Sequence, residues 1–184
     1  MKHKVLFLKA ILERQRCSSK FGVDFILRGL SLLIRAGFII MFIRQILNAK
    51  AYKGVVTAEP STPLKNLSDV LSKYNFGCLV ISGDGFTADG ILSERDIVRA
   101  FSRHGSAALE LRAEHVMTRR LFVCSLDDDV DRILATMSKH RFRHMPVVEG
   151  KTLVGLVTLG DMVKAKLSRV SMENEALENM IKGY

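Results

Sequence analysis

The stretch GILSERDIVRA at residues 90–100 recurs as GLVTLGDMVKA at residues 155–165, which is 65 positions further along the chain. Upstream of it, FGCLVI at residues 76–81 aligns with FRHMPV at residues 142–147, at an offset of 66. A third pair of blocks, also 66 apart, consists of apolar residues at helical spacing: Leu64, Leu67 and Leu71 in one copy, and Val130, Ile133 and Met137 in the other. Three matching blocks in the same order predict two copies of one structural unit.

Each copy has the pattern of a β-α-β-β-α unit of about 60 residues. A short run of β-forming residues, at 55–57 or 122–124, precedes a polar turn and an amphipathic helix. Two apolar strands and a second helix complete the unit; the strands are expected at residues 78–81, 91–92, 145–148 and 153–157, and the second helices from Asp96 and Asp161. Because so small a unit buries little apolar surface alone, we expect a mixed α/β (α+β) fold with two repeats packed sheet to sheet as a pseudo-twofold pair.

These patterns divide the chain into four parts: an N-terminal segment at residues 1–43, repeats at 44–106 and 107–170, and a C-terminal helix at 171–184. The stretch MENEALENMI in the last part has an apolar helical face that is a candidate contact in a dimer. That face consists of Ala176, Leu177, Met180 and Ile181.

The net charge of +9 is concentrated near the N-terminus. Residues 1–54 contain 11 Lys and Arg against two acidic residues, which leaves 17 of each sign in residues 55–184. A neutral body in a chain without Trp and with three Tyr does not have the character of a DNA or RNA surface. We therefore expect no nucleic-acid partner.

The N-terminal segment is apolar over residues 25–43 but contains Arg28 and Arg35, whereas a membrane span needs about 20 residues with few or no charges. Three interpretations remain open: a basic amphipathic helix on an anionic membrane surface, a helix packed against a partner, or sequence upstream of a true start at Met41. The stretch MFIRQILNAK from Met41 is expected to form the short first helix of the folded part.

The signatures of common enzymes are missing from the sequence, since it has no GxSxG, GxxxxGK[ST] or HExxH motif. Cys17, Cys78 and Cys124 form no CxxC pair, so we expect a reducing cytoplasm and buried, unreactive thiols at the last two positions. The three Asp at 127–129 stand where a helix begins, and negative charge is favoured there without any metal. We expect neither catalysis nor a metal site.

The order of elements, with the pattern G-h-x-S/T-x-x-D closing each copy, resembles the cystathionine-β-synthase (CBS) domain, which occurs in tandem as a Bateman module. The resemblance covers about residues 44–170, and SERD at 93–96 and FRHMPV at 142–147 are similar to small stand-alone bacterial CBS-pair proteins. It implies a non-catalytic module that binds an adenine nucleotide between its repeats.

The same resemblance implies a role for the closing motif of each repeat. Ser93 and Asp96 would bind a ribose, because a carboxylate can accept both hydrogens of a cis-diol, and Thr158 with Asp161 would repeat the arrangement. The alternative is that each pair only caps the helix that follows.

Positive charge for a phosphate is expected at the Asp96 site alone. The resemblance implies contacts there from both repeats, through Arg95, Arg141, Arg143 and His144. The Asp161 site would instead face the uncharged Gly77 and Cys78, so we expect it to be empty or to hold a nucleoside-like group. The alternative for the arginines is a solvated basic face.

Adenine should be recognised mainly by apolar side chains and backbone groups. The candidates are Val55, Val56, Thr57, Leu79 and Val80, which we assign to the Asp96 cleft, together with Met145 and Pro146. The alternative for each is a place in the core.

As a function, we expect AMP, ADP, ATP or NAD(H) to bind at Asp96, bridge the repeats and change their packing, so that the module regulates an unknown protein target. A homodimer is expected, because the outer helices of such modules usually pack against a second module. Two alternatives remain open: a ligand-free dimerisation module, and a membrane-surface adaptor built on residues 25–43.

Overall fold

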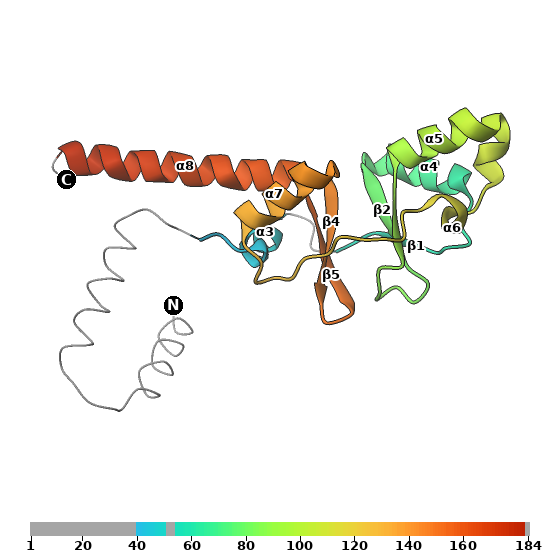
Figure 1. Cartoon of the computed structure of the whole chain (residues 1–184), viewed down its shortest axis with the longest axis horizontal. Helices are drawn as coiled ribbons and strands as arrows, with labels where there is room; N and C mark the ends of the chain where they lie inside the picture. The colour runs from blue at the N-terminus through green and yellow to red at the C-terminus, as the bar shows by residue number, and fades with distance from the viewer. Residues whose placement is uncertain (1–39, 51–53, 183–184) are drawn as a thin grey trace, which may run out of the picture. The chain divides into compact units, whose positions relative to one another are not determined.

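Two small β-sheets, one in each repeat, organise the computed structural model, which describes residues 40–50 and 54–182 (Figure 1). Ile40–Tyr184 form one compact unit. The elements up to the second repeat are α3 (Ile43–Ala49), β1 (Thr57–Ala58), α4 (Leu64–Tyr74), β2 (Cys78–Ile81), β3 (Gly90–Ser93), α5 (Glu94–His104), the short 3-10 helix η1 (Gly105–Glu110) and α6 (Ala113–Val116). The second repeat continues with α7 (Val130–His140), β4 (His144–Glu149), β5 (Thr152–Thr158) and α8 (Leu159–Lys182).

Part of the predicted organisation falls on residues that the structure does not describe. Most of the segment 1–43, including Cys17, lies outside the described residues, so its helix, the start at Met41 and a membrane contact stay predictions. In the described part of the chain, every helix is too short or too polar to span a bilayer.

The first repeat forms a three-stranded sheet in the order β1-β2-β3. β1 pairs with β2 in parallel, and β2 pairs with β3 in antiparallel register, with Cys78 opposite Ser93. Helices α4 and α5 supply the rest of this core, where Leu67, Leu79 and Leu92 are almost completely buried. The predicted order of elements in this repeat is therefore confirmed, although β1 starts at Thr57 and not at Val55.

The second repeat contains a two-stranded antiparallel sheet of β4 and β5. The strand expected at residues 122–124 is wrong, because only Cys124 pairs there, in an isolated parallel bridge to Val147. Phe122 stacks instead on Phe142, with ring centroids 5.1 Å apart. The opening strand of this repeat is thus reduced to one residue, and the residues before it are available to line a cavity.

Helix α3 precedes the first repeat in sequence but packs into the core of the second. Ile43 and Ile46 are buried in that core, and the Ile43 amide donates to the Asp128 carbonyl at 3.0 Å. The Arg44 side chain pairs with Asp127. The short helix expected after Met41 is therefore confirmed, and residues 44–49, which the sequence boundaries place with repeat one, belong in space with repeat two.

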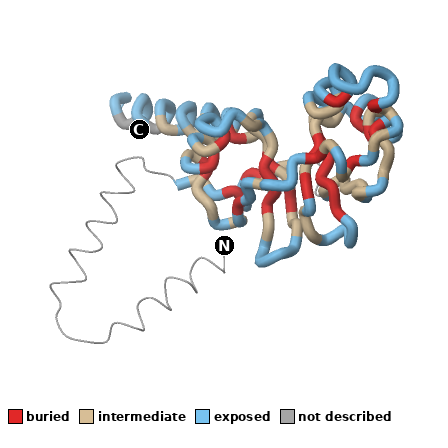
Figure 2. Tube along the Cα trace, turned by 45° about the vertical axis from the view of Figure 1, so that its right-hand side comes forward, coloured by how far each residue is buried: buried red, intermediate tan, exposed pale blue. Residues whose placement is uncertain are grey.

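The two repeats meet at the sheet faces that do not carry helices. Along β2, Leu79 and Ile81 lie in the first core, while Val80, which alternation directs to the opposite face, is also fully buried. The Leu153 amide at the start of β5 donates to the Phe86 carbonyl at 2.7 Å, which joins the repeats directly. Buried residues are concentrated on these strands and on the inner faces of the helices (Figure 2).

Helix α8 runs without a break from Leu159 to Lys182, so the boundary placed at 170/171 falls inside a continuous helix. Its first half is fixed to α7 by Asp131, which accepts from Lys166 at 2.6 Å and from Arg169 at 2.7 Å. These two bonds lower the pKa of Asp131. Of the expected apolar face, Leu177 and Ile181 are exposed.

Candidate functional site

Two cavities lie between the repeats, and each contains the closing Asp of one repeat. The Asp96 cleft has a volume of about 790 Å³, and the Asp161 cleft about 630 Å³. Side chains from both repeats line each of them. Those of the Asp96 cleft that bear on binding are Ser93, Arg95, Asp96, Arg99, Arg120, Phe122, Arg141, Phe142, Arg143, His144 and Pro146.

The carboxylate of Asp96 stands at the start of α5, where the chain leaves β3. Its Oδ2 accepts from the Ser93 amide at 2.9 Å and from the Ser93 hydroxyl at 2.6 Å. Its Oδ1 lies 3.8 Å from the Arg99 guanidinium, and the Asp96 side chain is 15% exposed. The helix-capping alternative is thus present in the structure, and it uses Oδ2 while Oδ1 lies toward the basic side chain.

The Asp96 cleft is strongly basic. Five arginines line it, against two acidic residues, Glu94 and Asp96; they are Arg95, Arg99, Arg120, Arg141 and Arg143. Guanidinium groups are the preferred partners of phosphate oxygens, because their N–H groups form bidentate, charge-assisted hydrogen bonds. The predicted phosphate residues therefore share one cavity with Asp96, together with His144, and this arrangement suits an anion with several phosphate oxygens.

Arg141 adopts a backbone conformation that is costly for its residue type. It caps the end of α7 in the left-handed region with φ 57°, as Asn75 caps α4 with φ 54°. Asn tolerates this region better than other residues with a side chain, because its short amide can bond locally. The chain therefore keeps an arginine on the Asp96 cleft at a position where the backbone favours asparagine.

Arg141→Asn is expected to raise the free energy of unfolding by about 0.5–1 kcal/mol, because it relieves the left-handed arginine. Urea unfolding measures the effect. As the reverse control, Asn75→Arg should destabilise the chain by a similar amount. Loss of stability in Arg141→Asn would contradict the interpretation.

Apolar groups lie beside the arginines in the Asp96 cleft. Phe122, whose ring stacks on Phe142, lines the cavity with Leu121 and Pro146. An aromatic face and flat apolar walls can hold a purine ring by stacking and burial. The cleft thus combines a candidate base surface, a carboxylate and a basic region.

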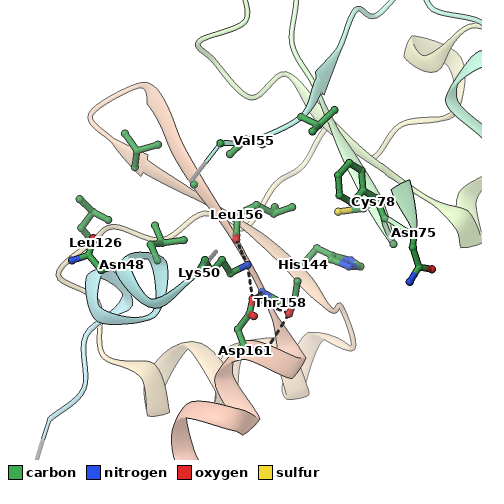
Figure 3. A pocket seen from close by; sticks show the side chains of 17 residues that line it. Asn48, Lys50, Val55, Asn75, Cys78, Leu126, His144, Leu156, Thr158 and Asp161 are labelled. Atoms are coloured by element: carbon green, nitrogen blue, oxygen red, sulfur yellow. Dashed lines mark hydrogen bonds and ion pairs between the residues drawn. The ribbon is translucent and has the colours of Figure 1, made fainter. Parts of the chain in front are cut away.

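The Asp161 cleft repeats the closing motif but differs in its charges (Figure 3). Oδ2 of Asp161 accepts from the Thr158 amide at 2.8 Å and hydroxyl at 2.9 Å, and the Lys50 ammonium lies 2.7 Å from it. Burial alone raises the pKa of Asp161, but the hydrogen bonds from Lys50 and Thr158 outweigh it and leave that pKa below its ordinary value. Gly77 and Cys78 line the cleft across from Asp161, as expected.

Several predicted adenine residues are placed elsewhere by the structure. Val55 and Val56 line the Asp161 cleft, so their assignment to the Asp96 cleft is wrong. Among the described residues that line either cavity, Thr57, Leu79, Val80 and Met145 do not occur; Leu79 and Met145 are core residues, each 1% exposed. Of the seven candidates, Pro146 lies on the Asp96 cleft.

Four residues that line the clefts were not predicted from the sequence: Lys50, Arg99, Arg120 and Phe122. The pseudo-twofold relation could have found the last two, because the segment that opens one repeat lies beside the closing Asp of the other. By that rule, residues 54–56 belong with Asp161 and residues 120–122 with Asp96, as the structure shows. No pattern indicated Lys50, whose position depends on the packing of α3 against the second repeat.

A common wall separates the two clefts. Gly77 and His144 line both, and a Cβ at Gly77 would lie 3.0 Å from Nε2 of His144. Burial is the main cause that lowers the pKa of His144, and Arg143 adds to it. Burial and the neighbouring Arg143 thus both disfavour the charged form of His144.

The cysteines within the described residues are poor nucleophiles. Cys78 and Cys124 are 6% and 2% exposed, and burial raises the pKa of each thiol to about 12. A thiol with this pKa carries almost no thiolate at neutral pH. The expected burial of both thiols is confirmed. In the described part of the chain, no group of three His, Cys, Asp or Glu is arranged to hold a metal ion.

Comparison with known proteins relates this geometry to one family. The family model described as CBS domain matches residues 48–103 and again residues 113–168. The mitochondrial CBS domain-containing protein CBSX3 of Arabidopsis thaliana is 29% identical over 117 residues, which are 61% of this chain and 57% of that protein. The CBS domain-containing protein YhcV of Bacillus subtilis is 25% identical over 126 residues, 68% of this chain and 88% of that protein. The chain thus spans little more than half of the Arabidopsis relative.

Solved structures agree with the family model. A CBS-domain protein of Agrobacterium tumefaciens has 32% identity and a TM-score of 0.65, with 70% of this chain and 96% of that chain covered. The CBS domain pair of protein MJ0100, solved with 5-methylthioadenosine and S-adenosyl-L-methionine, has 26% identity and a TM-score of 0.62, with 71% and 98% covered. Two repeats and the mixed α/β architecture are therefore both confirmed.

Proposed function

Because the chain belongs to the family of CBS-domain proteins, we propose that it is a non-catalytic regulatory module that binds an adenine nucleotide in the Asp96 cleft. The observation that carries the proposal is the convergence of Asp96 with five arginines on one cavity between the repeats. The solved neighbour that holds two adenosine compounds supports an adenosine moiety in the ligand.

The charges of the cleft favour a ligand with more than one phosphate. Asp96 would accept from the ribose hydroxyls, with Phe122 and Pro146 beside the base. The arginines would contact the phosphates, and they come from both repeats, with Arg95 on α5 and Arg143 before β4. Among AMP, ADP, ATP and NAD(H), we expect ATP, ADP and NAD(H) to bind more tightly than AMP, because each added phosphate can pair with a further guanidinium.

A nucleotide in this cleft would act on the packing of the repeats. It would contact both, so its binding free energy would favour the arrangement in which both sets of contacts are made. A partner protein that distinguishes the two arrangements would then respond to the nucleotide, with a coupling limited by the difference in affinity.

The experiment that tests the proposal is calorimetry with AMP, ADP, ATP, NAD+ and NADH on the wild type and on Asp96→Asn. Asparagine keeps an oxygen that can accept from Ser93 but replaces a charged acceptor of the ribose by a neutral one. We expect the nucleotides with more than one phosphate to bind the wild type, and Asp96→Asn to weaken their binding roughly tenfold. Asp69→Asn, on the exposed side of α4, is the matched control and should bind normally. No heat with any of the five compounds would leave a ligand-free dimerisation module.

A homodimer is the second part of the proposal. Val98 and Phe101 on α5, and Val163, Leu167 and Val170 on α8, are large apolar side chains more than 40% exposed. Val98 and Val163 are equivalent in the two repeats, so the two faces are related by the same pseudo-twofold relation and suit a second copy of the chain.

Light scattering should therefore give twice the chain mass of 20.6 kDa for the wild type. Phe101→Glu combined with Leu167→Glu should give the mass of one chain, because a buried unpaired charge opposes association. Lys151→Glu, at the exposed hairpin between β4 and β5, is the control and should remain dimeric. A wild-type mass of one chain would contradict the proposal.

A further inference from the structure

Lys50 fills a position in the Asp161 cleft that a ligand would need. Its ammonium lies 2.7 Å from Oδ2 of Asp161 and donates to the carbonyl of Leu156 at 2.9 Å (Figure 3). The side chains of Lys50 and Asp161 are 27% and 26% exposed, so water screens this pair only in part. With two further bonds from Thr158, this carboxylate oxygen already has three donors.

The equivalent place in the Asp96 cleft is occupied by main chain. Ile91 is the counterpart of Leu156 at the repeat offset of 65, and its carbonyl accepts from the Thr118 amide at 2.9 Å. In the second repeat the Leu156 carbonyl accepts from the Lys50 ammonium, which also contacts the Asp161 carboxylate. The ion pair of Asp96, with Arg99, is longer at 3.8 Å, and the Arg99 side chain is 63% exposed. Asp96 is therefore available to a diol in a way that Asp161 is not.

We propose that Lys50 is an internal occupant of the Asp161 site that excludes a nucleoside from it, so that Lys50 determines which of the two clefts takes a ligand. The statement that the open cleft is that of Asp96 rests on the proposed function. The exclusion itself does not, because it concerns only Lys50, Asp161 and the ribose diol that would compete with the ammonium. A diol would have to displace a charge-assisted hydrogen bond in a partly dry site, which is costly.

Adenosine is the probe for this inference, because it has the base and the diol but no phosphate for the arginines. The background is Asp96→Asn, which weakens the other cleft. We expect only weak adenosine binding to Asp96→Asn alone, and one adenosine per chain, bound at least tenfold more tightly, when Lys50→Met is added. Asp161→Ala on top of both should abolish that binding. Methionine keeps the length of the side chain without its charge, and circular dichroism checks the fold of each variant.

Lys50→Gln serves as a second variant in the event that Lys50→Met does not fold, since glutamine can still donate to Leu156. The inference is overturned if Asp96→Asn binds adenosine as tightly with Lys50 as without it, in a manner that Asp161→Ala removes. It is also overturned if the folded Met and Gln variants both fail to bind. Should the wild type bind none of the five nucleotides, the proposed function fails, while these comparisons in the Asp96→Asn background still decide the role of Lys50.

Discussion

Arg143→Glu is expected to weaken ATP binding by about 100-fold or more and to leave adenosine binding within a factor of about three. The side chain lies on the Asp96 cleft, is exposed, and belongs to the repeat opposite to Asp96. The change removes a phosphate partner and places a negative charge where the phosphates are expected. Like charges brought together in a binding site cost up to several kcal/mol, and about 1.4 kcal/mol corresponds to tenfold in affinity.

The difference between ATP and adenosine makes this prediction specific. A general disturbance of the cleft would weaken both ligands, whereas loss of a phosphate contact weakens only ATP. Lys151→Glu changes the net charge of the chain by the same amount at a site outside both clefts, and should leave ATP binding unchanged. Calorimetry measures the binding of ATP and of adenosine to both variants. The salt concentration is kept fixed, because added salt by itself weakens contacts between charges. Equal losses for ATP and adenosine would remove Arg143 from the phosphate site.

Ile43→Ala is expected to lower the free energy of unfolding by about 3 kcal/mol. Ile43 is fully buried in the core of the second repeat, although it precedes the first repeat in sequence. The change removes three carbon atoms, and with them buried apolar surface. It also leaves a cavity, because main-chain hydrogen bonds to Leu126 and Asp128 hold α3 in place. Urea unfolding followed by circular dichroism measures the change.

Ile181→Ala is the matched control, because the same atoms are removed from a side chain that is 86% exposed near the end of α8. A change within about 0.5 kcal/mol is expected there. A small effect at Ile43 would mean that α3 does not contribute to the second core. In that case the position of Lys50, which ends the same helix, would lose its support as well.

The repeat pattern predicted most of the fold because the spacing of apolar residues and the residues that begin helices indicate the same elements. Apolar residues spaced three or four positions apart, such as Leu64 and Leu67, indicate a helix, here α4. Ser93 and Asp96 indicate the start of α5. The predictions failed where tertiary contacts determine the local structure. Residues 122–124 have the composition of a strand, but the aromatic contact of Phe122 with Phe142 and the single pairing at Cys124 replace it.

The sequence predicted only part of the candidate site, because Arg99, Arg120 and Phe122 were missed. Asp96, Arg95 and Arg143 belong to motifs that each repeat carries in its own sequence, so their meeting on one cavity follows from the pairing of the repeats. The apolar side of each cleft depends on which repeat supplies the segment that lies beside the closing Asp. Val55 was assigned to the wrong cleft because this pairing of the repeats was not considered. Lys50 reaches Asp161 only because α3 crosses to the second repeat, which local sequence patterns do not encode.

The crossing of α3 also bears on the order in which the chain folds during synthesis. Arg44 and Asp127 are 83 residues apart in sequence, and the core that encloses Ile43 includes Met162. While the polypeptide leaves the ribosome, the first repeat has all its own strands and helices available long before that second core can close. We therefore expect the apolar side chains of α3 to stay exposed until the second repeat has been synthesised. The docking of α3 onto that repeat should then be the final, slow step of folding.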